Sequence, residues 1–280
     1  MVSKRKRRPG SREGPILFPL SDDRVWKPVL DARRVFLFLD LDGTLAEIRA
    51  HPGEVGLSPE RRRCLEELAV APWVRVAVVS GRRVEEVRNL IGIETFSYIG
   101  LHGLEVDIPH AERWLYPVSR EVIDALQSVR RKCAGSAHGV PGIWLEDKGL
   151  TLALHLRLAE KQKAGKVVES FLQAVRTRQE RGVPLELLRG KEVVEVKPTG
   201  ADKGRAVTRL WKRYGRGAFP VYVGDDVTDE TAFESLREKG MTILIAKSPR
   251  RTVADYYLRN PGEVYSFLRR LIALRAEKRG

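Results

Sequence analysis

The sequence predicts an α/β protein in which an open parallel sheet carries the functional site and a smaller α+β domain is inserted. Short apolar runs alternate with amphipathic helical segments in both the first and the last third of the chain, a pattern typical of parallel sheets. Each apolar run ends in polar residues, as expected where a ligand binds beyond the carboxyl ends of the strands. Between these regions, pairs of short strands stand beside two helices, which indicates a small α+β domain.

The composition indicates a globular protein. Of the 280 residues 42% are hydrophobic and 31% are charged, with no apolar run long enough to cross a membrane, which excludes disordered, collagen-like and membrane-spanning classes. The net charge of +14 suggests nucleic acid as a partner. However, residues 1–12 contribute +6 and residues 269–280 contribute +4, so the remainder carries only +4. Nucleic acid is therefore not an expected partner.

The cysteines and the N-terminus favour a reducing compartment. Cys64 and Cys133 are the two cysteines, and neither lies in a CxxC pattern, so a disulfide framework is excluded and ordinary thiols are expected. The basic N-terminus is followed by a stretch too short and too rich in proline for a signal peptide. We therefore expect a cytoplasmic protein, and the sequence leaves its oligomeric state open, a monomer being compatible with it.

Residues 1–32 are expected to form a basic, flexible N-terminal segment, because they combine a basic cluster with several prolines and glycines and lack periodicity. The larger domain is expected over 33–107 and 198–280, and the inserted domain over 108–197. Apolar runs predict strands buried on both faces, and 3.6-residue periodicity predicts helices. In the larger domain the expected strands are 35–39, 74–79, 221–223 and 241–246, and the expected helices are 58–69, 83–91, 203–214, 229–239 and 261–276.

The inserted domain is expected to contain a hairpin around residues 147–149, where Asp-Lys-Gly separates two apolar runs. Its expected helices are 119–134 and 159–180, and its expected strands are 144–146, 151–157, 185–188 and 192–197.

The strongest chemical feature is Asp40-Leu41-Asp42-Gly43-Thr44, directly after the first buried strand. Alternation along extended chain would direct Asp40 and Asp42 into one pocket, where two carboxylates repel each other unless a cation lies between them or one is protonated. Mg²⁺ prefers such oxygen ligands. A carboxylate held there can attack phosphorus while its neighbour moves the proton, and Thr44 can offer a hydroxyl to phosphate. On its own, Asp-Gly is also a common turn signal.

Two further segments suit an anionic substrate. Ser80, Gly81 and Arg82 follow the second strand and offer a hydroxyl, backbone amides and a guanidinium to phosphate oxygens. Lys203 begins a predicted helix, where a cation does not complement the helix dipole, so a phosphate is one reason for its presence. A plain helix N-cap at Ser80 and a solvated lysine are the alternatives.

A second acidic cluster, Gly224–Glu230, follows the strand 221–223. Asp229 and Glu230 can cap the next helix, where negative charge is favourable. Asp225 and Asp226 lie outside that helix, and their position after a buried strand indicates a metal site. The sequence leaves open which of Asp226 and Asp229 reaches the metal.

Four segments follow one another over about 35–270, in the order Asp-x-Asp-Gly-Thr, Ser, Lys and Gly-Asp-Asp. In these segments and their order the chain resembles the haloacid dehalogenase-like phosphatases. The resemblance implies a Rossmann-like core with a parallel sheet, an inserted cap, Mg²⁺ and an aspartyl-phosphate intermediate. By this resemblance Asp40 is the nucleophile and Asp42 the general acid/base. Ser80 and Lys203 hold the phosphoryl group, and Asp225 completes the Mg²⁺ site with Asp40 and the backbone oxygen of Asp42.

Several segments are similar to the sugar-phosphate branch of that superfamily, and especially to the trehalose-6-phosphate phosphatases of trehalose biosynthesis. They are Leu101–Glu105, Leu145–Gly149, Gly190–Pro198 and the Gly224–Glu230 cluster. The resemblance implies that the cap reads a sugar phosphate. It also implies that Lys191 and Glu195 hydrogen-bond its hydroxyls, with Glu105 and Lys148 as further candidates.

Three alternatives stay open at this point. A phosphatase of the same architecture could act on sucrose 6-phosphate, mannosyl-3-phosphoglycerate or a hexose phosphate. A non-catalytic regulatory module could keep the fold, although the clustered charges at Asp40, Asp42, Lys203 and Asp225 argue against it. A nucleic-acid-binding protein is suggested by the basic tails alone.

Overall fold

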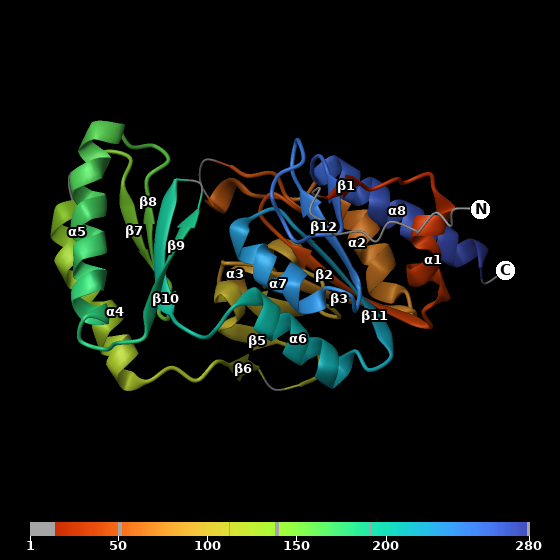
Figure 1. Cartoon of the computed structure of the whole chain (residues 1–280), viewed down its shortest axis with the longest axis horizontal. Helices are drawn as coiled ribbons and strands as arrows, with labels where there is room; N and C mark the ends of the chain where they lie inside the picture. The colour runs from red at the N-terminus through yellow and green to blue at the C-terminus, as the bar shows by residue number, and fades with distance from the viewer. Residues whose placement is uncertain (1–14, 50–51, 112, 138–139, 191, 279–280) are drawn as a thin grey trace, which may run out of the picture. The chain divides into compact units, whose positions relative to one another are not determined.

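The computed structural model describes residues 15–49, 52–111, 113–137, 140–190 and 192–278, and the chain divides into two compact units (Figure 1). The first unit consists of Met1–Trp114 and Asp202–Gly280, and the second of Leu115–Ala201. The inserted domain expected over 108–197 thus differs at both boundaries from the second unit. The chain leaves the first unit later than expected because Ile108 and Trp114 still pack against an apolar cluster of that unit.

The first unit contains a nine-stranded sheet with the order β1-β13-β12-β11-β2-β3-β4-β5-β6. Neighbouring strands from β1 to β4 pair in parallel, and β5 pairs with β4 in the antiparallel sense. The strands are β1 (Ile16–Leu17), β2 (Arg34–Asp40), β3 (Val74–Val79), β4 (Ser97–Gly100), β5 (Glu105–Asp107), β6 (Trp114–Leu115), β11 (Ala218–Gly224), β12 (Met241–Ile245) and β13 (Tyr256–Leu258). The predicted parallel α/β architecture is confirmed.

Helices cover both faces of this sheet, because its central strand is apolar on both. In β2, Val35, Leu37 and Leu39 pack with α1, α2, α3 and α8, whereas Phe36 and Phe38 pack with α6 and α7. The helices are α1 (Asp23–Asp31), α2 (Pro59–Val70), α3 (Val84–Ile91), α6 (Lys203–Tyr214), α7 (Glu230–Leu236) and α8 (Pro261–Glu277), with short 3-10 turns η1 (Pro52–Glu54), η2 (Leu101–Gly103) and η3 (Val227–Asp229).

Residues 15–32 do not match the flexible N-terminal segment expected over 1–32. They form β1 and α1, and Trp26 and Val29 of α1 are completely buried. Asp22 caps the helix by accepting from the backbone N–H of Arg24 at 3.1 Å. The Trp26 ring stacks on Phe267 of α8 with centroids 4.9 Å apart, so packing compensates for the weak local signal. Residues 1–14 lie outside the described part of the chain.

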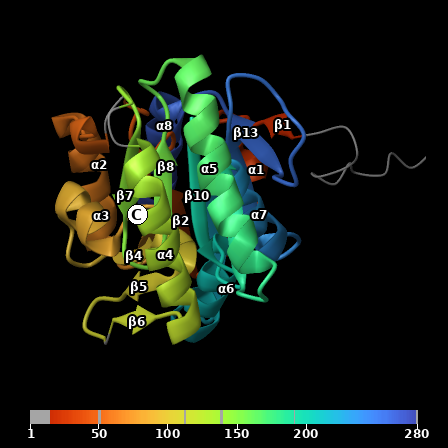
Figure 2. The ribbon, with the colours of Figure 1, turned by 90° about the vertical axis from the view of Figure 1, so that its left-hand side faces the viewer.

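The second unit is a four-stranded antiparallel sheet, β7-β8-β10-β9, with two helices on one face (Figure 2). Leu152, Leu154, Val194 and Val196 point to these helices, and the alternating residues form the opposite face. The elements are α4 (Arg120–Ala137), β7 (Trp144–Asp147), β8 (Leu152–His155), α5 (Lys161–Gln179), β9 (Leu185–Gly190) and β10 (Val193–Pro198). The predicted hairpin is formed by β7 and β8.

No helix in the described part of the chain is both long enough and apolar enough to cross a membrane.

Candidate active site

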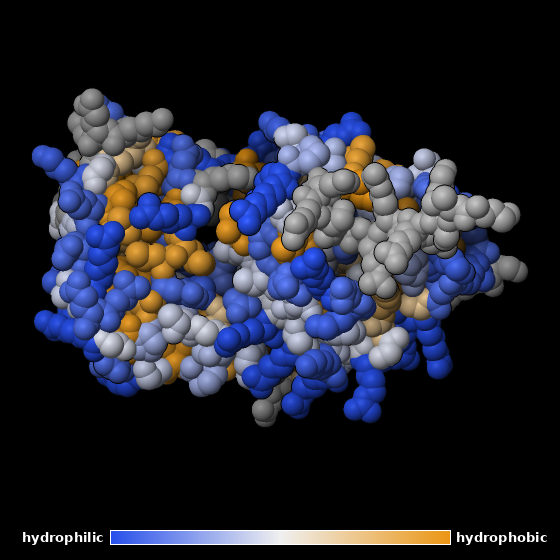
Figure 3. All heavy atoms as spheres, in the orientation of Figure 1, coloured by the Kyte–Doolittle hydropathy of each residue, from blue (hydrophilic) through white to orange (hydrophobic). Residues whose placement is uncertain are grey.

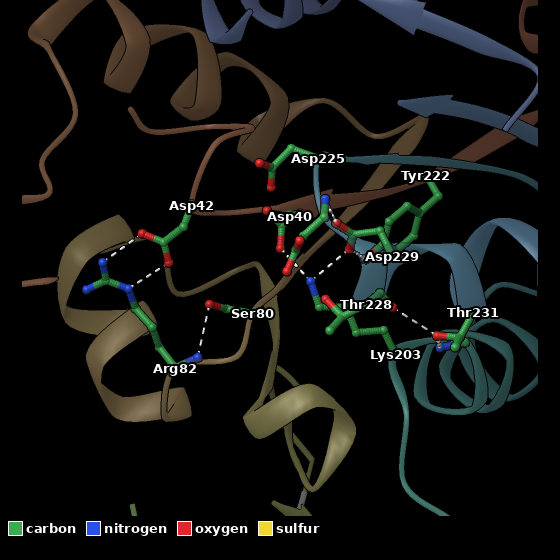
Figure 4. Close-up of polar contacts among 12 residues, drawn as sticks. Asp40, Asp42, Ser80, Arg82, Lys203, Tyr222, Asp225, Thr228, Asp229 and Thr231 are labelled. Carbon is green, nitrogen blue, oxygen red and sulfur yellow. Dashed lines mark hydrogen bonds and ion pairs between the residues drawn. The ribbon is translucent and has the colours of Figure 1, made fainter. Parts of the chain in front are cut away.

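Three buried carboxylates meet at the carboxyl end of the parallel sheet (Figure 4). Asp40 is the last residue of β2, Asp225 follows β11 directly, and Asp229 ends η3. β11 and β2 are neighbours in the sheet, with Val223 opposite Leu39, so their carboxyl ends lie side by side. One carboxylate oxygen from each of the three residues lies within 4.8 Å of the others. The structure thus brings together Asp40 and Asp225, which the sequence predicted as metal ligands, and adds Asp229, whose place near the metal the sequence left open.

Lys203 is the cation of this cluster. Its Nζ donates to Oδ1 of Asp40 and to Oδ1 of Asp229, each at 2.7 Å, and its side chain is only 3% exposed. Burial lowers the pKa of Lys203, but the Asp229 and Asp40 carboxylates outweigh it and hold the pKa above its usual range. Three carboxylates against one ammonium group leave a formal charge of −2 in a buried site.

The charge balance also affects Asp40. Burial raises the pKa of Asp40, Lys203 lowers it, and the Asp229 and Asp225 carboxylates raise it, so that the pKa lies well above its usual value. The side chains alone thus leave an excess of negative charge next to the carboxyl group of Asp40. A divalent cation with oxygen ligands would neutralise that excess. The donor set, carboxylate oxygens of Asp40 and Asp225 close together, fits Mg²⁺ in kind.

Asp229 differs from the other two carboxylates because protein donors occupy it. Its Oδ1 accepts from Lys203 and from the Tyr222 hydroxyl at 2.6 Å, and its Oδ2 accepts from the Asp226 backbone N–H at 2.9 Å. Burial and the neighbouring Asp229 charge raise the pKa of Tyr222 well above its usual range. Asp229 precedes α7 but makes no side-chain hydrogen bond that caps this helix. Its carboxylate instead takes part in the capping box of η3 with Asp226, and the same carboxylate also accepts from Lys203. The sequence signal for this second role of Asp229 is Lys203 at the start of α6, because a lysine at that position needs a counter-charge.

Gly43 makes room for Asp225. Its φ of +92° lies in the left-handed region, and a Cβ atom at this position would stand 2.3 Å from Asp225 Oδ2. The Gly43 backbone N–H donates to Ala46 O at 2.7 Å and closes the turn after β2. Glycine therefore serves both the turn and the close approach of a carboxylate to the backbone.

Asp42 does not join the carboxylate cluster. Its side chain points to Arg82, whose Nε and Nη2 donate to Oδ2 and Oδ1 at 2.8 and 2.7 Å (Figure 4). Asp40 and Asp42 therefore have different partners, Lys203 and Arg82, because β2 ends at Asp40 and strand alternation stops there. The carboxylate of Asp42 is about one third exposed. A bidentate ion pair of this kind fixes both side chains.

The expected phosphate ligands differ in their contacts. Ser80 directly follows β3 and lies beside Asp40, since Val79 is opposite Asp40 in the sheet. Its Oγ accepts from the Arg82 backbone N–H at 3.1 Å. α3 begins only at Val84, with Arg83 as its N-cap residue, so Ser80 is not the helix cap. Thr44 is completely buried, and its Oγ1 has no hydrogen-bond partner among the described residues. That orphaned hydroxyl is the kind of group a bound phosphate would satisfy.

Gly81 is tightly packed as well. A Cβ atom at Gly81 would stand 2.6 Å from the ring of His102. A side chain between Ser80 and Arg82 would therefore require the His102 ring to shift.

Glu105, one of the expected sugar contacts, has structural partners. Its Oε2 accepts from the backbone N–H of Val84 at 2.9 Å and pairs with Arg113 at 2.9 Å. This places the carboxylate at the N-terminus of α3, where negative charge is favourable. The burial of Glu105 is thus explained without a ligand.

Two other expected sugar contacts lie together within the second unit. Lys148 Nζ is 3.5 Å from Glu195 Oε1 and 3.8 Å from Glu146 Oε2, and both Lys148 and Glu195 are buried. Thr151 donates to Glu195 at 2.6 Å, and His155 contacts Glu146 at 2.8 Å. Burial raises the pKa of Glu146, but the His155 hydrogen bond and the Lys148 charge outweigh it and lower the pKa. Lys191 lies outside the described residues.

Comparisons with known proteins identify the family. The family model for trehalose-phosphatase matches residues 38–261. The chain is 33% identical to trehalose-phosphate phosphatase B of Arabidopsis thaliana, over 86% of this chain and 67% of that protein. It is 32% identical to a trehalose 6-phosphate phosphatase of Zea mays, over 91% of this chain and 74% of that protein. The chain thus spans about two thirds to three quarters of the length of these relatives.

Solved structures show the same fold. The C-terminal domain of a trehalose-6-phosphate phosphatase from C. albicans aligns with a TM-score of 0.82 and 22% identity, over 94% of this chain and 99% of that one. A haloacid dehalogenase-like hydrolase from Bacteroides thetaiotaomicron aligns with a TM-score of 0.62 and 16% identity, over 85% and 99%. The resemblance inferred from the four motifs is confirmed, and this chain belongs to the trehalose-phosphatase family, with the haloacid dehalogenase-like fold.

Proposed function

We propose that this chain hydrolyses trehalose 6-phosphate to trehalose and phosphate in trehalose biosynthesis, with Mg²⁺ and through an aspartyl-phosphate formed on Asp40. Family membership supports the substrate class. The observation that carries the chemistry is the buried arrangement in which Lys203 bridges Asp40 and Asp229 at 2.7 Å on each side. A nucleophilic carboxylate needs a fixed orientation and a neighbouring positive charge, and Lys203 supplies both.

In the first step an oxygen of Asp40 attacks phosphorus, and the bond between phosphorus and the sugar oxygen breaks. Because Lys203 occupies Oδ1 of Asp40, the other carboxylate oxygen is the candidate nucleophile. Lys203 also stands beside the position of the transferring phosphoryl group, where its charge offsets developing negative charge. The Thr44 hydroxyl and the Ser80–Arg82 loop are the proposed phosphate contacts.

Asp42 is the proposed general acid for the departing sugar alkoxide, and afterwards the base that activates water to release phosphate. The pair with Arg82, bidentate at 2.7 and 2.8 Å, stabilises a resting position for Asp42. Asp42 must turn away from Arg82 to reach the leaving oxygen, and Arg82 is then released to contact a phosphate oxygen. Proton transfer requires hydrogen-bond reach in the substrate complex rather than before it.

The proposed Mg²⁺ ligands are Asp40, Asp225 and the backbone oxygen of Asp42. When bound, the ion supplies positive charge to the phosphoryl oxygens and balances the excess negative charge of the cluster. Asp229 is proposed as a positioning residue for Lys203, because three protein donors already occupy its two oxygens.

For the sugar, we propose Lys148 and Glu195 of the second unit together with Lys191. The support is that Lys148 and Glu195 form a buried cluster of charged and polar side chains on the sheet face opposite α4 and α5. Such a cluster can exchange its internal hydrogen bonds for those of sugar hydroxyls. Glu105 stays a prediction from resemblance, because its observed contacts are with Val84 and Arg113.

We also propose a cytoplasmic location. Cys64 and Cys133 are free and buried, as is usual for proteins that fold under reducing conditions. The proposed substrate is a small molecule, and neither nucleic acid nor a membrane is proposed as a partner.

Phosphate release measured with Mg²⁺ over a panel of sugar phosphates tests the function. The panel contains trehalose 6-phosphate, sucrose 6-phosphate, mannosyl-3-phosphoglycerate and glucose 6-phosphate, with Asp40→Asn as the inactive control. We expect the highest kcat/KM with trehalose 6-phosphate. Equal kcat/KM values over the panel would refute the preference for trehalose 6-phosphate but would still indicate a sugar phosphatase. No phosphate release from any member would refute the proposed phosphatase activity.

A further inference from the structure

A second pocket lies within the first unit, away from the carboxylate cluster. It has a volume of about 390 Å³ and lies between the chain segment that follows β5 and the last two turns of α6. Its lining combines apolar side chains, among them Val106, Ile108 and Leu210, with the side chains of three arginines. Pockets for small organic molecules have volumes of about 300–1,000 Å³, an apolar lining and a few converging polar groups. This pocket has the size of such a site and both kinds of lining group.

Two of the lining arginines have no carboxylate partner among the described residues. Arg209 lies over the indole of Trp114, 3.8 Å from the ring centroid, and Arg213 donates to the Tyr214 hydroxyl at 3.1 Å. Neither guanidinium pairs with an acidic side chain in the described part of the chain. Both lie four residues apart on α6 and therefore on one face of the helix. The hydrophilic surface over α6 is visible in Figure 3.

A third arginine also lines the pocket. Arg113 lines the pocket and pairs with Glu105 at 2.9 Å. Among the described lining residues and their partners, three guanidinium groups and one carboxylate give a formal charge of +2. Glu112, between Ala111 and Arg113, lies outside the described residues. Guanidinium groups favour carboxylate, sulfonate and phosphate oxygens, which they can bind in a bidentate manner.

We propose that this pocket is a second binding site of the chain, for an organic anion that has a flat apolar body. The body would lie on Val106, Ile108 and Leu210, and the anionic group would pair with Arg209 and Arg213. A second copy of a sugar phosphate fits less well, because hydroxyl groups that contact Val106, Ile108 and Leu210 would lose hydrogen bonds to water. The inference goes beyond the proposed function and does not depend on it.

The site is distinct from the phosphate site, although both use α6. Lys203 is the first residue of α6, and a helix rises about 1.5 Å per residue. Arg209 and Arg213 therefore lie about 9–15 Å along the axis from Lys203. A ligand in the pocket would contact the far end of the helix that positions Lys203.

Calorimetric titration of the full chain with naphthalene-2-sulfonate tests the site, because this aromatic anion cannot be hydrolysed by a phosphatase. Neutral 2-naphthol and inorganic sulfate serve as half-probes for the apolar body and the charge. We expect naphthalene-2-sulfonate to bind at least tenfold more tightly than either half-probe. In the double variant Arg209→Gln/Arg213→Gln its affinity should fall at least tenfold.

Lys212→Gln is the matched control, because it removes one positive charge from the same turn of α6 at an exposed position that does not line the pocket. It should change the affinity less than twofold. Ala111→Trp keeps the charges and adds a side chain at the pocket wall, so it should abolish binding. Wild-type binding that is unaffected by the arginine and Ala111 variants, or absent at millimolar probe, would overturn the proposal. Unchanged circular dichroism of each variant shows that it folds.

Discussion

Replacing Lys203 by methionine tests the electrostatic design of the site. The substitution keeps most of the apolar stem and removes the Nζ that donates to Asp40 and Asp229 at 2.7 Å. Asp40 and Asp229 then stay buried with Asp225 and no cation. Asp229 keeps its hydrogen bonds from Tyr222 and Asp226, whereas Asp40 loses its lysine partner.

Removing one partner of a buried ion pair costs about 3–5 kcal/mol of unfolding free energy. The loss expected for Lys203→Met in the absence of metal lies in this range, because the lysine is 3% exposed and its two partners are 6% and 0% exposed. For turnover, the loss of one fixed donor at a developing negative charge costs about 10²–10³-fold in kcat. Both effects follow from the same two contacts.

Urea unfolding in EDTA measures the first effect, and phosphate release with Mg²⁺ measures the second. Lys212→Met serves as a control on the exposed side of the same helix. The double variant Lys203→Met/Asp229→Asn removes one uncompensated charge, so part of the lost stability should return, and the cycle gives the coupling between the two residues. A Lys203→Met protein within 0.5 kcal/mol (about the effect of a surface substitution) of wild type would refute the reasoning.

Three further predictions follow from particular contacts. Gly43→Ala should lower kcat more than tenfold, because its Cβ meets Asp225, while Gly53→Ala, with open space around it, should leave kcat unchanged in the same assay. Trp26→Ala should cost about 3–5 kcal/mol in urea unfolding, since Trp26 is fully buried. A loss under about 1 kcal/mol, half the smallest value for truncating a buried Leu, Ile or Met to alanine, would contradict the packing of α1. Burial raises the pKa of Cys64 and Cys133 to about 11, so the native protein should not react with a disulfide reagent at pH 8, and both thiols should react after unfolding.

Much of the fold could be predicted because local pattern and tertiary environment agree. The run 35–39 is apolar throughout, as a strand between two helical layers requires, and it lies within β2. The helix expected over 203–214 coincides with α6, whose Asp202 cap accepts from the Arg205 backbone N–H at 2.8 Å. The carboxyl-edge positions of Asp40, Ser80 and Asp225 follow from the same parallel topology.

Local patterns failed where a distant partner decides the structure. Segment 15–32 looked irregular because α1 is short and contains Pro28, yet Trp26 anchors it against α8. Strand alternation predicted that Asp42 points the same way as Asp40, but the strand ends at Asp40 and the Asp42 carboxylate pairs with Arg82. Asp229 resembled a helix cap because sequence shows the next helix and does not show Lys203, which is distant in the chain.

The nucleophilic role of Asp40 is the central claim, and trapping the covalent intermediate tests it most directly. The chain is mixed with trehalose 6-phosphate and Mg²⁺, quenched in acid within one turnover, digested and examined by mass spectrometry, with Asp42→Asn used to slow hydrolysis. We predict one added phosphoryl group on the peptide that contains Asp40, and none in Asp40→Asn. Full turnover in wild type with no phosphorylated peptide, or a phosphoryl group on a peptide without Asp40, would contradict it.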